Sequence, residues 1–117
     1  IGDGVKIQNN VSIYEGVIIE DNVFLGPSCV FTNDLTPRAE FPKGRANYVR
    51  TFIKEGATIG ANATIVCRIS IGRYAMVAAG SVVTKNIPDY CLVRGNPARI
   101  CGRVNEKGEI VSKGYVD

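Results

Sequence analysis

Residues 53–83 read IKEGATIGANATIVCRISIGRYAMVAAGSVV, and a bulky apolar residue recurs at every sixth position of this stretch. These residues are Ile53, Ile59, Ile65, Ile71, Val77 and Val83. The same period runs through the start of the chain, where the corresponding residues are Ile1, Ile7, Ile13, Ile19, Leu25 and Phe31. A period of six fits neither the 3.6-residue turn of a helix nor the two-residue alternation of an ordinary strand. It is typical of a short-repeat β-solenoid.

Turn-forming residues recur in phase with the apolar ones. Glycine or asparagine stands three residues after a bulky residue at Gly4, Asn10, Gly16, Asn22, Gly56, Asn62, Gly80 and Asn86. Both tolerate left-handed backbone, so each repeat is predicted to be a short strand closed by a turn. A second apolar or small residue follows each bulky one by four positions, as at Val5, Cys29, Leu35, Ile69 and Ile87. Plain strands in a β-sandwich are the alternative, but a sandwich needs no phase-locked glycine or asparagine.

The pattern predicts an all-β fold, a parallel β-helix of about four coils with three repeats in each coil. Apolar residues 18 positions apart should stack on one another, as in the pairs Ile1–Ile19, Ile7–Leu25 and Ile53–Ile71. Residues 37–52 break the repeat and are predicted to form a loop extruded at one corner, where function is common. We assign residues 1–103 to the repeat domain. Residues 104–117 are predicted to form a hairpin, with Gly108 in its turn, that caps the last coil.

Composition limits the classes of function. The chain has 117 residues, which fits one domain, and its net charge of +3 is too weak to indicate nucleic acid as a partner. No apolar run approaches the length of a membrane span, so we expect no membrane insertion. The four cysteines lack CxxC spacing and histidine is absent, so we expect no metal and a reducing, cytoplasmic location. Residue 1 is Ile and falls directly into the repeat, so we expect the chain to begin inside a longer solenoid.

Residues 79–88 (AGSVVTKNIP) and 93–99 (VRGNPAR) resemble the final coil of the left-handed β-helix acyltransferases that use acetyl-CoA. Residues 6–12 (KIQNNVS), 26–28 (GPS) and 30–38 (VFTNDLTPR) are similar to the branch that N-acetylates nucleotide-linked amino sugars. The nearest members act on UDP-2-acetamido-3-amino-2,3-dideoxyglucuronate, a precursor of bacterial surface polysaccharides such as lipopolysaccharide. The resemblance covers almost the whole chain and implies a left-handed helix, which the period alone does not give, and a homotrimer.

The resemblance places the sugar-contacting asparagine of this branch at Asn33, which we predict to be catalytic, with a plain turn residue as the alternative. The sugar is expected to contact Gln8, Asn9, Asn10 and Arg38, although Asn10 also fills a turn position. The predicted acetyl-CoA site comprises Ala61, Ala79 and Gly80 along the pantetheine, Lys85, Arg94 and Arg99 at the phosphates, and Pro97 and Ala98 of the terminal motif.

These features together predict an acetyl-CoA-dependent N-acetyltransferase for a nucleotide-linked amino sugar. A neutral amine attacks without prior deprotonation, which suits a chain that lacks the histidine most hexapeptide acetyltransferases use as a base. The missing histidine disfavours transfer to a hydroxyl group and excludes the zinc-dependent γ-carbonic anhydrases, which share the fold. The alternative from another class is a non-catalytic β-solenoid that serves as a scaffold or trimerisation module. The loop and the terminal motif favour the enzyme, since a scaffold needs neither.

Overall fold

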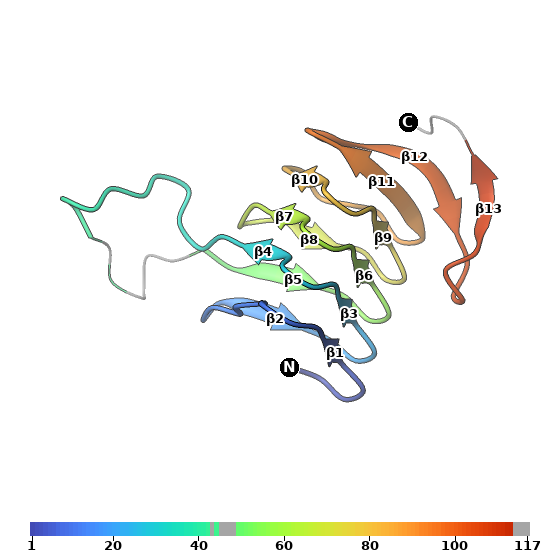
Figure 1. The fold of residues 1–117 in the computed structure, drawn as a ribbon, viewed down its shortest axis with the longest axis horizontal. Helices are drawn as coiled ribbons and strands as arrows, with labels where there is room; N and C mark the ends of the chain where they lie inside the picture. Colours follow the sequence, from blue (N-terminus) through green and yellow to red (C-terminus); the bar gives the residue numbers. More distant parts are fainter. Residues whose placement is uncertain (43, 45–48, 114–117) are drawn as a thin grey trace.

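The computed structural model describes residues 1–42, 44 and 49–113. The regular secondary structure in these ranges consists of β-strands. None of the described residues forms a helix that could cross a membrane. Figure 1 shows short strands stacked in a column, with three longer strands at the C-terminal end. The strands are β1 (Lys6–Ile7), β2 (Val17–Ile19), β3 (Phe24–Leu25), β4 (Val30–Phe31), β5 (Thr51–Ile53), β6 (Thr58–Ile59), β7 (Thr64–Ile65), β8 (Ser70–Ile71), β9 (Met76–Val77), β10 (Val82–Val83), β11 (Cys91–Gly95), β12 (Ala98–Val104) and β13 (Ile110–Lys113).

The strands build three parallel walls. The first wall contains β1, β3, β6, β9 and β11, the second β2, β5 and β8, and the third β4, β7 and β10. Neighbours within a wall come from successive coils and run parallel, as the sequence predicts. We call the connections the charged corner (residues 2–4, 20–22, 54–56, 72–74 and 88–90), the small-residue corner (8–10, 26–28, 60–62 and 78–80) and the loop corner (14–16, 32–34, 66–68 and 84–86, with the loop).

Apolar residues stack in register along the walls. Two of the predicted pairs are strand partners, namely Ile7 with Leu25 and Ile53 with Ile71. The Gly2 N–H donates to the Ile19 carbonyl over 2.8 Å, which places Ile1 beside Ile19, although Ile1 is 73% exposed at the end of the stack. Away from that end the inward side chains are buried in one continuous core. Each buried Ile or Leu contributes about 1.5–3 kcal/mol to folding.

Left-handed backbone closes the corners. The predicted glycine and asparagine turn positions all have positive φ except Asn86. Ser28, Arg68 and Tyr74 occupy equivalent positions with φ of 59°, 73° and 55°. Left-handed backbone costs such residues about 1–2 kcal/mol each. The stacking of coils therefore imposes the turn conformation even where the residue type opposes it.

The last coil is shorter than the sequence period predicts. The period makes Ile87 the second apolar residue of its repeat, but the structure pairs Ile87 with Ile71, 16 residues earlier. β11 keeps this spacing, because Leu92 pairs with Met76. The corner after β10 therefore lacks two residues. Asn86 helps to close it through its side chain, whose Oδ1 accepts a 2.9 Å hydrogen bond from the Ser70 N–H.

Both ends of the loop lie earlier in the sequence than the predicted boundaries, residues 37 and 52. The period assigns Leu35 to the inward face, but Leu35 is 46% exposed, and the buried Thr51 takes its place beside Val17. β5 begins at Thr51, inside the predicted loop of residues 37–52, so the connection between β4 and β5 spans residues 32–50. Residues 43 and 45–48 of this loop lie outside the described residues.

Three strands cover the C-terminal end of the stack. β11 extends the first wall in parallel, and β12 and β13 continue it as antiparallel strands. Gly108 lies in the turn between β12 and β13 with φ of 80°, and Asn105 Oδ1 accepts hydrogen bonds from the Lys107 and Glu109 N–H groups, each at 3.0 Å. The antiparallel part begins at Ala98, within the predicted repeat domain of residues 1–103. Residues 114–117 of the predicted cap lie outside the described ranges.

Candidate active site

The small-residue corner brings together two of the predicted sets. Gln8, Asn9 and Asn10 lie on the first coil, and the Asn9 carbonyl accepts a 2.9 Å hydrogen bond from the Ser28 N–H of the next coil. Further along, the Gly80 N–H donates to the Ala61 carbonyl over 2.8 Å, and the register of Ile59 with Val77 places Ala79 over Ala61. Three of the four residues predicted to contact the sugar therefore share one edge of the solenoid with those predicted along the pantetheine.

Glycines let the coils approach closely at this corner. A Cβ atom on Gly26 would lie 2.7 Å from the Ala61 nitrogen, and one on Gly60 would lie 2.6 Å from the Ala79 nitrogen. These two glycines are thus required by packing between coils rather than by a ligand. Gly80 differs, because no described residue lies within 4 Å of a Cβ atom added to it. The outer side of the corner is open there, which would let an extended ligand lie against the backbone.

Asn33 lies at the loop corner, where the chain leaves the stack. Its side chain is half-buried, and its carbonyl accepts a 3.3 Å hydrogen bond from the Val49 N–H, which joins the two ends of the loop. The preceding residue, Thr32, accepts a 2.9 Å hydrogen bond from the Cys67 N–H through its Oγ1. The backbone at Asn33 is therefore fixed from two sides. Arg38 is exposed farther along the loop, and its carbonyl accepts from the Phe41 N–H at 3.0 Å.

A single copy of the chain does not bring all the predicted residues together. Asn33 and Lys85 belong to the loop corner, whereas Gln8, Asn9, Asn10, Ala61, Ala79 and Gly80 belong to the small-residue corner. The third wall separates these two corners. One copy therefore places the residues predicted at these two corners in two separate groups, which we call the two half-sites of the prediction.

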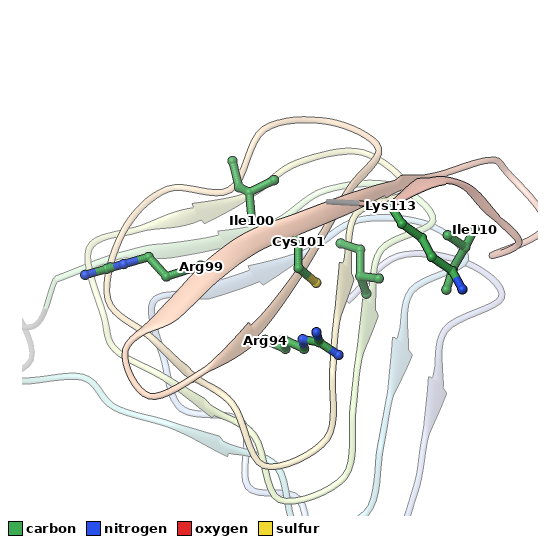
Figure 2. Close-up of a pocket in the computed structure, with 7 residues that line it drawn as sticks. Arg94, Arg99, Ile100, Cys101, Ile110 and Lys113 are labelled. Atoms are coloured by element: carbon green, nitrogen blue, oxygen red, sulfur yellow. The ribbon is translucent and has the colours of Figure 1, made fainter. Parts of the chain in front are cut away.

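Arg94 and Arg99 meet on the cap as direct partners across β11 and β12. They line a pocket of about 580 Å³ whose other walls are largely apolar, formed by Leu92, Ile100, Cys101, Ile110 and Lys113. In Figure 2 the side chains of Arg94 and Arg99 extend in different directions from the two strands. Pro97 lies in the turn between the two strands and Ala98 begins β12, and neither residue lines the pocket. Lys85 is exposed at the loop corner.

Lys113 is the cationic residue that sequence reasoning missed. It pairs with Gly102 at the far edge of the sheet, which brings it to the same pocket as Arg94. Residues 110–113 read IVSK and show no period-two alternation, so no signal in the sequence indicated this placement. The register of β13 depends instead on irregularities in its pairing with β12 and in the pairing of β12 with β11.

Cys29 and Cys91 do not supply a nucleophile. Burial raises the pKa of the Cys29 thiol and, likewise, that of Cys91, so both stay protonated at neutral pH. Within the described ranges, no group of three or more His, Cys, Asp or Glu side chains could hold a metal ion. The chemistry available at the two half-sites is hydrogen bonding by Asn33 and backbone groups, together with cationic side chains.

Comparison with known proteins identifies the repeat. The model of the family described as bacterial transferase hexapeptide (six repeats) matches residues 1–33 and 50–85, more than half of the chain. The match omits the loop and the cap. The parallel walls, the hexapeptide repeats and the acetyltransferases that resemble the chain together fit a left-handed β-helix.

Individual relatives are acetyltransferases with different acceptors. The dTDP-3-amino-3,6-dideoxy-alpha-D-galactopyranose 3-N-acetyltransferase of Aneurinibacillus thermoaerophilus is 62% identical over 58 residues, which are 50% of this chain and 30% of that enzyme. Serine acetyltransferase 2 of Arabidopsis thaliana is 40% identical over 106 residues, 91% of this chain and 28% of the relative. The chain thus spans less than a third of either relative.

One similar solved structure contains both CoA and a nucleotide-linked amino sugar. A mutant of GDP-perosamine N-acetyl transferase from Caulobacter crescentus, in complex with CoA and GDP-perosamine, superposes with a TM-score of 0.70. It shares 25% identity, and the match covers 87% of this chain and 41% of that one.

Proposed function

Because the chain belongs to the bacterial transferase hexapeptide family, we propose that it transfers an acetyl group from acetyl-CoA to the amino group of a nucleotide-linked amino sugar. The observation that carries this proposal is the 62% identity over 58 residues to a sugar 3-N-acetyltransferase. The neighbour that binds CoA with GDP-perosamine supports the same combination of donor and acceptor. The acceptor would be a precursor of a surface polysaccharide. A cytoplasmic location belongs to the same proposal, in keeping with four free cysteines.

Transfer to the hydroxyl group of serine is the second candidate, favoured by the match to serine acetyltransferase 2 over 91% of the chain. A hydroxyl group must lose its proton to become a good nucleophile, which calls for a general base, whereas a neutral amine attacks directly. The 117 residues contain no histidine to act as that base. The amine acceptor is therefore the better fit to this chain.

The proposed reaction needs positioning rather than strong base catalysis. The lone pair of the sugar amine attacks the thioester carbonyl carbon, the C–S bond breaks, and the departing thiolate of CoA takes the proton released by the nitrogen. Asn33 accepts a hydrogen bond from an N–H of the amine through its side-chain oxygen, which aims the lone pair at the carbonyl. Such orientation can lower a barrier by about 7–11 kcal/mol in favourable cases. A backbone N–H donates to the oxyanion.

A complete site, in this proposal, combines the two half-sites from different copies of the chain. The proposal therefore includes a homotrimer in which the loop corner of one copy faces the small-residue corner of the next, an arrangement that cyclic symmetry closes. The charge distribution supports it. Four segments that form the small-residue corner and the third wall carry no charged residue, although 21% of the chain is charged. We call this the uncharged face, residues 8–14, 26–32, 60–66 and 78–84. Subunit interfaces are depleted in charge in the same way.

Release of free CoA thiol in the presence of different acceptors tests the function. We expect release with dTDP-, UDP- or GDP-linked amino sugars and little with serine or with the hydroxyl analogue of the same sugar. The pH dependence of kcat/KM should follow the titration of the acceptor amine instead of an imidazole near neutrality. Serine acetylation faster than that of every amino sugar would overturn the proposal in favour of the second candidate.

A further inference from the structure

Two arginines lie side by side at the loop corner on adjacent coils. The Arg68 N–H donates to the Arg50 carbonyl over 3.1 Å, so the two side chains leave the backbone at neighbouring positions of one column. Both residues are exposed, and among the described residues neither has an ion-pair partner. Adjacent like charges repel one another, so nothing in the folding of the coil favours this arrangement.

A pocket of about 390 Å³ opens beside these arginines. It is lined by Arg50 and Arg68 together with Val49, Phe52, Ile69, Ser70 and Asn86. Phe52 points outward from the second wall and is 40% exposed, although a phenyl ring gains free energy from burial. The pocket thus combines two unpaired cations, an aromatic ring and two polar side chains on one concave surface.

The pocket lies next to the predicted catalytic residue. Val49, which lines it, donates its N–H to the Asn33 carbonyl over 3.3 Å. A ligand bound in this pocket would therefore reach the point where Asn33 and Val49 join the two ends of the loop. The cap pocket with Arg94 and Arg99 lies on the first-wall sheet, so the two cationic pockets are separate.

We propose that the Arg50–Arg68 pocket binds a nucleoside diphosphate group. Guanidinium groups bind phosphate oxygens bidentately, and an exposed aromatic ring offers a stacking surface for a base. This inference rests on the proposed function, which supplies two ligands with such a group, the nucleotide-linked sugar and CoA. The position beside Asn33 favours the sugar nucleotide, because the amine of that substrate is the group Asn33 would orient.

Isothermal titration with dTDP, UDP and CoA, without any acyl transfer, tests the assignment. Arg50→Gln and Arg68→Gln should each weaken dTDP or UDP binding by about tenfold or more, since each loses charged hydrogen bonds to phosphate. Phe52→Leu should weaken binding of the nucleotides but not of inorganic pyrophosphate. Arg73→Gln is the matched control. Arg73 is an exposed arginine at the charged corner whose guanidinium lies 3.4 Å from Glu55, and its loss should leave nucleotide binding unchanged.

The ligands separate the two sources of the diphosphate. A loss confined to dTDP and UDP assigns the pocket to the sugar nucleotide, and a loss confined to CoA assigns it to the acyl donor. Unchanged binding of all three in both arginine variants would overturn the proposal. The titration measures nucleotide binding and not acetyl transfer, so the two proposals can fail separately. If nucleotide binding depends on the arginines but the assay of released CoA shows no acetylation of any amino sugar, the proposed function is refuted and the nucleotide pocket is not.

Discussion

Asn33 is fixed through its backbone, which leaves its side chain available for a ligand. Its carbonyl accepts the hydrogen bond from Val49, and the neighbouring Thr32 is held by Cys67. Substitution of the side chain should therefore spare the neck of the loop. This separation makes Asn33 a clean position at which to test the proposed orientation of the amine.

Asn33→Ala should lower kcat for amino-sugar acetylation by about 10–100-fold, the usual effect of losing one positioning hydrogen bond. The free energy of unfolding should change little, because the side chain is only half-buried and its backbone contacts remain. Steady-state kinetics and urea denaturation of the same preparation check both statements. An Asn33→Ala protein with unaltered kcat but reduced stability would make Asn33 a structural turn residue.

Thr51 and Ser81 are both buried hydroxyl residues, but their hydroxyl groups differ in bonding. Thr51 Oγ1 has no hydrogen-bond partner among the described residues, whereas Ser81 Oγ accepts a 3.3 Å hydrogen bond from the Gly95 N–H. Thr51→Val should therefore be neutral or stabilising by about 1 kcal/mol, because it removes an unpaired polar atom without changing shape. Ser81→Ala should cost about 1 kcal/mol, since it leaves the Gly95 N–H unpaired. Urea denaturation that ranks the two variants in the opposite order would contradict this account.

At the scale of the element, glycine sets the distance between coils. Gly60→Ala should destabilise the protein by about 1–3 kcal/mol, because the new methyl group would lie 2.6 Å from the backbone nitrogen of Ala79, which cannot move without its coil. Gly44→Ala is a matched control in the loop, where none of the residues that the structure describes lies within 4 Å of the added atom. Equal unfolding free energies for the two variants would show that the coils can separate at this corner.

The sequence predicts the walls well and their interruptions poorly. The period of six identifies the inward residues because each coil repeats the same environment. It cannot choose between Leu35 and Thr51, because the inserted segment preserves the phase on both sides, and the two residues compete for the position beside Val17. Likewise, Ile87 keeps the apolar pattern in either of two registers, and only closure of the short last coil decides between them.

The candidate site was predictable only in parts. The resemblance identified residues on both half-sites, but their separation by the third wall follows from the coil geometry and not from any motif. The Arg50–Arg68 pair was not predicted, because the residues are 18 positions apart and become neighbours only once the coils are in register. Neighbour relations across coils are the information that the linear pattern lacks.

At the scale of the whole molecule, the uncharged face makes a prediction about assembly. Thr64→Lys places a charge on the outer side of the third wall and should dissociate the proposed trimer, because a buried unpaired charge costs several kcal/mol. Thr58→Lys is the matched control: both threonines are half-buried and each precedes an isoleucine in a two-residue strand, but Thr58 lies on the first wall. Sedimentation equilibrium checks the masses. If Thr58→Lys dissociates the trimer and Thr64→Lys does not, the proposed interface is wrong and the first wall forms it instead.

The shortened last coil has a consequence for growth of the column. A stack of identical coils ends in an unpaired sheet edge, on which the first coil of another molecule could continue the pattern and build a fibre. Here the final turn is two residues short and is followed by antiparallel strands, so the C-terminal edge no longer repeats the spacing of the other coils. An incoming coil would meet antiparallel strands where it needs a parallel one, and a last coil that is shorter than the others. The C-terminal end of the column is therefore a poor template for end-to-end polymerisation.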